Sequence, residues 1–241
     1  MFKLGDIKYI IWDLDNTLVK CSPLVSPYFI WLMCETFKKY GSPIKVIQGL
    51  HRAKKIMYSA HESGDNYYKI INNFALGSGL DFSQCLEQFE YSMPRILGSL
   101  KPFFKPIGAA KSLVEKLESQ IIFILATNSL WPEYFAKLRL QWALLDPRRF
   151  AFITHAHNMK YCKPQVEYYQ EIINKQEIIR DTCLYIGDNY IKDAPATKAG
   201  LTTVILSKRE GLRLIKPAGL SCAALYEGNY KSIGGLFGIE I

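Results

Sequence analysis

The sequence predicts an α/β fold: a doubly wound (Rossmann-like) parallel sheet with an α-helical cap domain inserted into it. Short, strongly apolar runs are typical of strands buried on both faces. Helical segments alternate with these runs, and this alternation indicates a parallel sheet. Between Leu18 and Leu100 the alternation stops, and helical patterns continue without a convincing strand.

Five apolar runs are the expected strands of the sheet. They are Tyr9–Trp12, Ile121–Ala126, Phe150–Thr154, Cys183–Ile186 and Thr202–Leu206. The helical segments expected beside them are Ala109–Leu117, Pro132–Trp142, Pro164–Asn174 and Ala194–Ala199. Proline near a helix start suits the first turn, and Gly200 suits the end of the last segment.

The inserted segment carries helical patterns over Tyr28–Tyr40, Ile44–Ala60 and Phe82–Ser92. Prolines punctuate both of its edges, where a chain would pass from one body to another and back. We therefore expect a core domain of residues 1–19 and 101–241 and a helical cap domain of residues 20–100. The tail, residues 211–241, is weakly patterned.

Composition and charge describe an ordinary folded protein with a basic surface. The chain has 241 residues, of which 49% are hydrophobic and 22% are charged, and this excludes a disordered or collagen-like protein. Its net charge of +8 favours encounter with anionic molecules. The basic residues are scattered without the dense run of a nucleic-acid tail, so an anionic small-molecule substrate is permitted, and nucleic acid is possible but not favoured.

Three features predict a cytoplasmic protein without membrane contact, and we separately expect a monomer or homodimer. The six cysteines show no C-x-x-C spacing, which argues for reduced thiols. The first ten residues do not resemble a secretory leader. The longest apolar stretch, Tyr28–Cys34, is far shorter than the ~18 residues that a membrane span requires.

Polar residues follow the expected strands where ligands bind in open parallel sheets, beyond the carboxyl ends of the strands. They are Asp13, Asp15, Asn16, Thr127, Asn128, Lys163, Asp188 and Asp193. Four carboxylates at one edge repel one another unless a cation is bound. Mg²⁺ prefers such hard oxygen ligands, which suits Asp13 and Asp188 as direct ligands with Asp193 nearby.

These motifs resemble those of the haloacid dehalogenase (HAD) superfamily. An apolar strand ends in D-x-D-x-T at Asp13, a Thr follows the second strand at Thr127, Lys163 precedes a proline, and G-D-x-x-x-x-D runs from Gly187 to Asp193. The resemblance extends from Tyr9 to about Leu206. One departure is Asn16, because many members have glycine there.

The resemblance implies a role for each motif. Asp13 would attack phosphorus to form an aspartyl-phosphate, and Asp15 would act as acid and then as base. Thr127, Lys163 and backbone amides near Asn16 and Asn128 would hold the phosphate. Mg²⁺ would be bound by Asp13, Asp15, Asp188 and Asp193. The helical insertion would close over the site as a mobile cap.

Three functions stay open at this point, led by a Mg²⁺-dependent phosphomonoester hydrolase acting on a small metabolite. The dehalogenase and phosphonate-cleaving branches lack an acid at the position of Asp15, so phosphoryl chemistry is favoured. The alternatives are a phosphomutase or phosphotransferase on the same scaffold and a non-catalytic protein that binds anions or nucleic acid. Asp193 could serve only as a helix cap, and His155 with His157 suits a turn better than a metal site.

Overall fold

The fold is described from a computed structural model, which covers residues 7–59, 65–216 and 223–241. A seven-stranded sheet forms its centre, in the order β5-β4-β1-β6-β7-β9-β8. Five strands coincide with the expected ones to within two residues at either end: β1 (Tyr9–Trp12), β4 (Ile122–Leu125), β5 (Phe150–Ile153), β6 (Cys183–Gly187) and β7 (Thr202–Leu206). All five pair in parallel, which confirms the predicted fold class.

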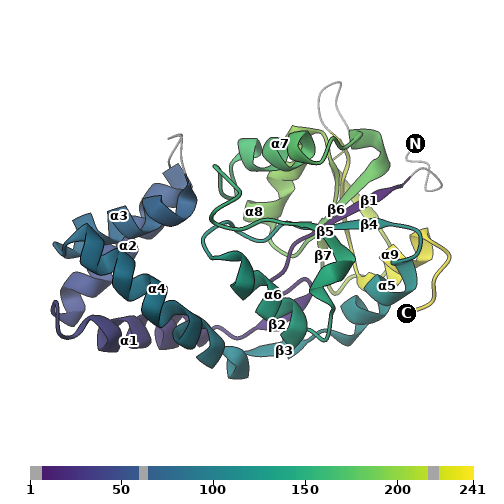
Figure 1. The fold of residues 1–241 in the computed structure, drawn as a ribbon. Coiled ribbons are helices and arrows are strands. Elements are labelled where there is room, and N and C mark those ends of the chain that lie inside the picture. The colour runs from purple at the N-terminus through teal and green to yellow at the C-terminus, as the bar shows by residue number, and fades with distance from the viewer. Residues whose placement is uncertain (1–6, 60–64, 217–222) are drawn as a thin grey trace.

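Helices cover both faces of the sheet (Figure 1). One face packs against α5 (Gly108–Leu117), α6 (Glu133–Trp142) and α9 (Tyr230–Leu236), and the other against α7 (Val166–Lys175). The central strand β1 shows why both faces are apolar: Ile10 and Trp12 belong to the first core cluster, whereas Ile11 belongs to the second. Successive side chains of a strand point to opposite faces, so a run buried on both sides is apolar throughout.

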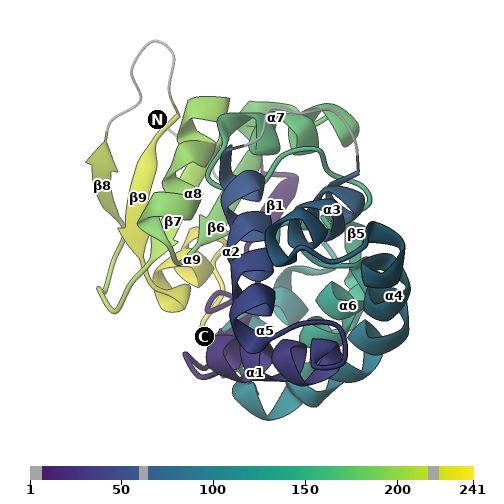
Figure 2. The same cartoon turned by 90° about the vertical axis from the view of Figure 1, so that its left-hand side faces the viewer.

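The insertion consists of four helices, α1 (Val25–Phe37), α2 (Pro43–Ser59), α3 (Asn66–Ser78) and α4 (Phe82–Ser99). We call these four helices the helical insertion. They lie in front of the sheet in Figure 2 and join it through a ribbon of two antiparallel strands, β2 (Val19–Cys21) and β3 (Phe104–Pro106). Helix α4 continues through Pro94 to Ser99, beyond the expected end at Ser92.

The tail is more ordered than its sequence pattern predicts. It contributes β8 (Arg213–Lys216), β9 (Leu225–Gly228) and α9, and β8 is the antiparallel edge strand of the sheet. The Tyr230 hydroxyl of α9 donates a hydrogen bond of 2.6 Å to the Thr17 carbonyl, which ties the tail to the turn after β1. The expected helix Ala194–Ala199 is a 3₁₀ helix that follows the short α8 (Tyr190–Asp193). Other 3₁₀ turns lie at Lys101–Phe103, Pro147–Arg149 and Arg180–Thr182.

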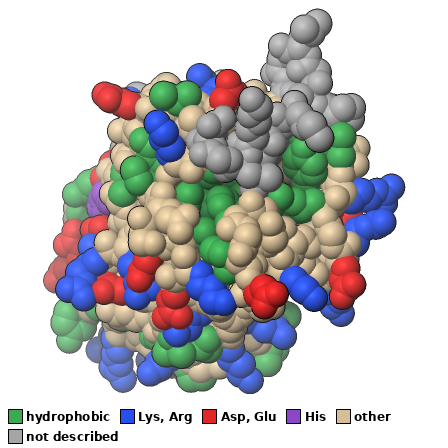
Figure 3. All heavy atoms as spheres, turned by 90° about the vertical axis from the view of Figure 1, so that its right-hand side faces the viewer, with side chains coloured by type: hydrophobic (Ala, Val, Ile, Leu, Met, Phe, Trp, Pro, Cys, Tyr) green, Lys and Arg blue, Asp and Glu red, His purple; other side chains and the backbone are tan. Residues whose placement is uncertain are grey.

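The surface agrees with the scattered charge of the sequence. Figure 3 shows Lys and Arg side chains interspersed with Asp and Glu on one face of the molecule, without a continuous basic patch on that face. None of the helices in the described part of the chain has both the length and the apolar character to cross a bilayer.

Candidate active site

The three central strands bring the sequence motifs together. In the sheet, β1 lies between β4 and β6, and Trp12 at the end of β1 is in register with Leu125 and Ile186. Parallel strands in register end at the same edge. Asp13, Thr127 and Asp188 follow these three strands and therefore emerge side by side.

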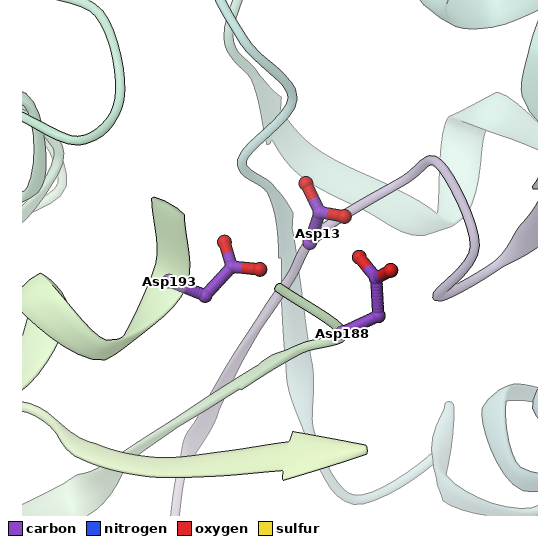
Figure 4. Close-up of side chains that lie close together, drawn as sticks. All are labelled: Asp13, Asp188 and Asp193. Atoms are coloured by element: carbon purple, nitrogen blue, oxygen red, sulfur yellow. The ribbon is translucent and has the colours of Figure 1, made fainter. Parts of the chain in front are cut away.

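Asp13, Asp188 and Asp193 form a cluster of carboxylates. Their closest oxygen atoms all lie within 4.8 Å of one another, and Figure 4 shows the three side chains turned toward a common point. Asp13 is 9% exposed and Asp193 is 1% exposed. Like charges this close need a cation nearby.

Lys163 supplies one positive charge to this cluster. Its Nζ donates to Asp13 Oδ1 at 2.6 Å and to Asp193 Oδ1 at 2.8 Å, and the residue is 1% exposed. Asp193 also accepts hydrogen bonds from the Tyr185 hydroxyl at 2.7 Å and from the Asn189 amide at 3.0 Å. The buried lysine is thus paired on two sides, and Asp193 is fully engaged.

Gly187 makes the close approach of Asp193 possible. A Cβ atom added to Gly187 would lie 2.4 Å from Asp193 Cγ, well inside van der Waals contact. The loop from Gly187 to Asp193 is held by the Asn189 side chain, which accepts from the amides of Ile191 and Lys192 and so caps α8. A larger residue at position 187 would displace the Asp193 carboxylate.

Burial and crowding set the protonation of the cluster. Burial raises the pKa of Asp13 to about 7, against the opposing charge of Lys163 and with the repulsion of Asp193 added. Burial, with the repulsion of Asp193, also raises the pKa of Asp188 to about 6. Burial disfavours the charge on Lys163, but Asp13 and Asp193 outweigh it and hold its pKa well above the usual value. The cluster is short of positive charge.

The donor set fits Mg²⁺. Asp13 and Asp188 offer carboxylate oxygens, Lys163 occupies only one oxygen of Asp13, and the elevated pKa values of both acids mark a site where a further cation is favourable. Mg²⁺ binds through one or two carboxylates and keeps its remaining positions for water and phosphate oxygens. The imidazole and thiolate ligands that favour zinc are absent from the acidic cluster found among the described residues.

The sequence analysis assigned Asp15 as a metal ligand, but Asp15 is not one of the three clustered carboxylates. Its Oδ2 accepts a hydrogen bond of 2.6 Å from Nη1 of Arg139, a residue of α6 that is 2% exposed. The negative charge of Asp15 still acts on Asp13 and on Asp188, so this carboxylate lies near the cluster without belonging to it. The turn after Asp15 is built around Asn16, whose φ of 61° is left-handed.

The backbone conformation at position 16 explains why asparagine can replace the glycine that many family members have there. Asparagine is one of the few residues that adopt a left-handed backbone readily. Its Oδ1 accepts from the Cys21 amide at 3.0 Å, and its own amide donates to the Val19 carbonyl at 2.6 Å. That amide is therefore engaged within the turn rather than directed at a ligand.

Thr127 and Asn128 follow β4 at the same edge. The Thr127 hydroxyl lies 3.4 Å from Nη2 of Arg139. The backbone carbonyl of Thr127 accepts hydrogen bonds from the hydroxyl groups of Thr154, at 2.6 Å, and Tyr168, at 2.7 Å. The Asn128 amide group reaches across to the helical insertion, where Nδ2 donates to the Tyr58 hydroxyl at 3.3 Å. The loop after β4 is thus held by Thr154 and Tyr168 of the core and contacts α2 through Asn128.

The helical insertion touches the core at the edge that carries the carboxylates. Asn66 of α3 is fully buried there, and its Nδ2 lies 3.5 Å from the Ser129 carbonyl and 3.8 Å from Cys162 Sγ. Asp65, the N-terminal cap of α3, has its Oδ2 2.8 Å from Nδ1 of His157. His157 lies on the surface, as expected, and contacts the insertion through this pair. We call the contact of Tyr58, Asp65 and Asn66 with the core the seam.

Several buried polar atoms at the seam and beside it have no protein partner. Within the described ranges these include Asp15 Oδ1, Asn66 Oδ1, Asn128 Oδ1 and Ser129 Oγ. Leaving a buried donor or acceptor unpaired costs about 1–3 kcal/mol. These unpaired atoms lie beside the acidic cluster and are candidate contacts for a polar ligand.

Sequence reasoning missed Arg139 and Asn66. Arg139 lies four residues after Phe135 on the buried side of α6, so a charged residue within the apolar stripe of a helix was the available signal. Asn66 follows a capping aspartate at the start of α3, a helix that the sequence analysis did not predict. No signal in the sequence distinguishes it from an ordinary first-turn residue.

Comparison with known proteins identifies the family. The family model of the haloacid dehalogenase-like hydrolases matches residues 10–206. The chain belongs to this family. No curated protein sequence matches it significantly.

Solved structures of other HAD proteins share the fold at low sequence identity. The 2-haloacid dehalogenase of Pseudomonas syringae pv. Tomato is 16% identical, with a TM-score of 0.62 over 96% of this chain and 98% of that chain. The HAD phosphatase of Thermococcus onnurineus is 17% identical, with a TM-score of 0.57 over 97% and 99%. YfnB of Bacillus subtilis, bound to magnesium, is 16% identical, with a TM-score of 0.56 over 97% and 99%. At these identities the likeness concerns the fold, and the activities named differ.

Proposed function

We propose that this HAD-like hydrolase is a Mg²⁺-dependent phosphatase that hydrolyses small phosphomonoesters through an aspartyl-phosphate. The observation that carries the proposal is the pairing of Asp13 with the buried Lys163, within one carboxylate cluster with Asp188 and Asp193, while Asp15 stands two residues away. A dehalogenase needs no acid at the position of Asp15. Phosphoryl transfer needs one, because the leaving oxygen must be protonated.

Asp13 is the proposed nucleophile. Its carboxylate oxygen bonds to phosphorus while the bond from phosphorus to the leaving oxygen breaks, and Asp15 gives that oxygen a proton. In the second half, Asp15 takes a proton from water as the water oxygen attacks phosphorus and releases Asp13. One residue thus acts as acid and then as base.

Positive charge allows an anionic nucleophile to approach an anionic phosphate. One unit-charge pair at 4 Å costs about 4 kcal/mol at an effective dielectric of 20. Lys163 offsets part of this repulsion, and the Thr127 hydroxyl is available for a phosphate oxygen. Mg²⁺ held by Asp13 and Asp188, with Asp193 behind, would supply the remaining charge on the phosphate oxygens. The Asp15 carboxylate is reserved for proton transfer instead of metal binding.

The helical insertion is the proposed cap domain, and its seam is the proposed substrate pocket. Asn66, Asn128 and Ser129 leave polar atoms unpaired in a buried place. Amide oxygens accept hydrogen bonds, so the group that leaves with its oxygen should carry hydroxyl or amine donors. This supports a small polar metabolite phosphate and disfavours nucleic acid, which would need a continuous basic surface.

The test measures phosphate release from an aryl phosphate and from a panel of phosphorylated metabolites. We expect turnover only with Mg²⁺ and none after Asp13→Asn, with the fold retained in circular dichroism. Asp181→Asn, an exposed aspartate ahead of β6, is the matched control and should keep full activity. Turnover retained by Asp13→Asn would reject the assigned nucleophile.

A phosphomutase or phosphotransferase is the second candidate, since the acceptors of the seam could equally hold the hydroxyl of an acceptor substrate. The aspartyl-phosphate would be the same, and only the group that takes the phosphoryl would differ. Analysis of product isomers alongside phosphate release separates the two functions. A transfer product without free phosphate would favour the second.

The cytoplasm is the compartment that we propose for this enzyme. The cysteines of the described segments are unpaired, and three of them, Cys85, Cys162 and Cys183, are fully buried. Cys222 lies outside the described residues. Free thiols persist where the surroundings are reducing.

A further inference from the structure

Arg139 is a buried charge that the reaction described above does not use. It lies on α6 at 2% exposure, on the same side of the helix as Phe135 and Leu140, which are core residues. A guanidinium is always charged, and placing it out of water costs several kcal/mol unless it is well paired. The residues that pair with the Arg139 guanidinium therefore indicate its role in the protein.

The guanidinium joins two residues of the proposed machinery. Nη1 donates to Asp15 Oδ2 at 2.6 Å, and Nη2 lies 3.4 Å from the Thr127 hydroxyl. The Phe135 ring lies beneath it, with Cζ 4.5 Å from the ring centroid, and its carbonyl accepts from Nε at 3.4 Å. Two parallel donors over an aromatic ring are a geometry that arginine provides and lysine does not.

The two oxygens of Asp15 stand in different surroundings. Oδ2 is taken by Arg139, whereas Oδ1 is buried and has no partner among the described residues. A carboxylate held through one oxygen cannot turn freely, so the position of the other oxygen is fixed as well.

We propose that Arg139 is a positioning residue that orients Asp15 and leaves Oδ1 as the atom that transfers the proton. This inference rests on the proposed function. The proton moves from Oδ1 to the leaving oxygen as the phosphorus–oxygen bond breaks, and returns to Oδ1 from the attacking water. Arg139 takes no part in bond formation and acts through Asp15.

Kinetics of single and double variants test this role. We expect Arg139→Met to lower kcat by about 10²-fold, the cost of a misplaced catalytic group, with KM for an aryl phosphate changed less than about threefold. Arg139→Lys should recover part of the loss, because one donor still reaches Asp15. In an Asp15→Asn background, Arg139→Met should change kcat less than about twofold, because its action through the Asp15 carboxylate is already lost.

Two results would overturn the proposal. An equal loss of kcat from Arg139→Met in the native and the Asp15→Asn backgrounds would show that Arg139 acts independently of Asp15. A rise in KM with unchanged kcat would assign it to ground-state binding instead. Arg148→Met, at an exposed arginine whose side chain is 91% accessible, is the matched control and should leave kcat and KM unchanged.

A second readout does not depend on activity. Crystal structures of the native protein and of Arg139→Met should show the Asp15 carboxylate rotated in the variant, and Arg139→Leu, which also lacks a donor, serves if the methionine variant does not fold. An Asp15 side chain unmoved in the variant would overturn the role of Arg139. Absence of any turnover by the native protein would reject the proposed function, and the two crystal structures would still decide the position of Asp15.

Discussion

The carboxylate cluster and the seam are neighbours that differ in how well their polar atoms are paired. In the cluster, Lys163 lies between Asp13 and Asp193, and Asp193 has additional donors. At the seam, the fully buried Asn66 has one long contact to a carbonyl and one to sulfur, and its Oδ1 has none. The difference teaches that the sheet edge and Lys163 organise the carboxylate cluster without a ligand, whereas the proposed substrate pocket at the seam has polar atoms left to pair.

The largest expected effect comes from removing the charge at the centre of the cluster. Lys163→Met should lower kcat by about 10³-fold, because an uncompensated charge pair of about 4 kcal/mol corresponds to nearly three decades in rate. It also leaves Asp13 and Asp193 buried without their cation. Steady-state kinetics at saturating Mg²⁺ measures the effect, with the exposed Lys160→Met as control. A loss below tenfold would mean that Lys163 is a packing residue.

A smaller effect is expected from crowding the cluster without changing its charge. Gly187→Ala places a methyl group where Asp193 Cγ lies 2.4 Å away, so the carboxylate must move. We expect a loss of about 1–3 kcal/mol in the free energy of unfolding and of about 10²-fold in kcat. Gly98→Ala is the matched control, because nothing lies within 4 Å of its added Cβ. Equal behaviour of the two variants would contradict the tight packing of this loop.

The pH dependence of Mg²⁺ binding distinguishes the cluster from an ordinary acidic surface. The pKa of Asp13 is raised to about 7 and that of Asp188 to about 6, so both are protonated at pH 5 and ionised at pH 8. Because protons compete with the metal, we expect the Kd of Mg²⁺ to be at least about tenfold weaker at pH 5. Isothermal titration calorimetry measures it, and Asp188→Asn should reduce both the affinity and its pH dependence.

The same groups set the stability of the metal-free protein. A carboxyl whose pKa is raised on folding contributes stability at acid pH, below its unfolded value, and loses that contribution as pH rises through the folded value. As pH rises from about 4, near the unfolded pKa of 3.8, the stability of the metal-free protein should therefore fall progressively, up to about pH 6 through Asp188 and up to about pH 7 through Asp13. Added Mg²⁺ should raise the melting temperature more at pH 8 than at pH 5. An equal rise at both values would argue against these acids as ligands.

The smallest effect is expected at the outer end of the seam. Asp65→Asn keeps an oxygen that can cap α3 but removes the ion pair with His157, an exposed contact worth about 0–1 kcal/mol. Asp65→Ala removes the cap as well and should cost about 1 kcal/mol more. Urea unfolding at pH 6 measures both variants. Identical stabilities would show that the cap hydrogen bond contributes nothing.

The sequence predicts the chemistry of the sheet edge better than its surroundings. Asp13 and Asp188 could be found because each stands directly after a strand whose apolar run is a local pattern. Arg139 could not be assigned a partner, because its contact with Asp15 joins residues far apart in the chain, and only packing decides which helix face meets the strand end. The role of Asn66 could not be predicted either, because its contacts with Ser129 and Cys162 also join residues far apart in the chain.

The tail and the insertion show the same limit. Strands β8 and β9 are short and lie at one edge of the sheet, where β9 pairs with β7 and β8 pairs with β9, so their formation depends on contacts between segments that are apart in the chain. Helix α4 runs through Pro94, where local preference would end it, because its apolar face is buried against the other helices. Context overrides propensity in both places.

The ribbon of β2 and β3 has a consequence for how such a protein can diversify. The chain leaves the sheet at Val19–Cys21 and returns at Phe104–Pro106 as two paired strands, so the points of departure and return are held together by the ribbon's own hydrogen bonds. Whatever is spliced between them need not span any distance or supply any contact to the sheet. A module of different length or sequence could therefore stand between the same two strands and leave the sheet and its carboxylate cluster in place.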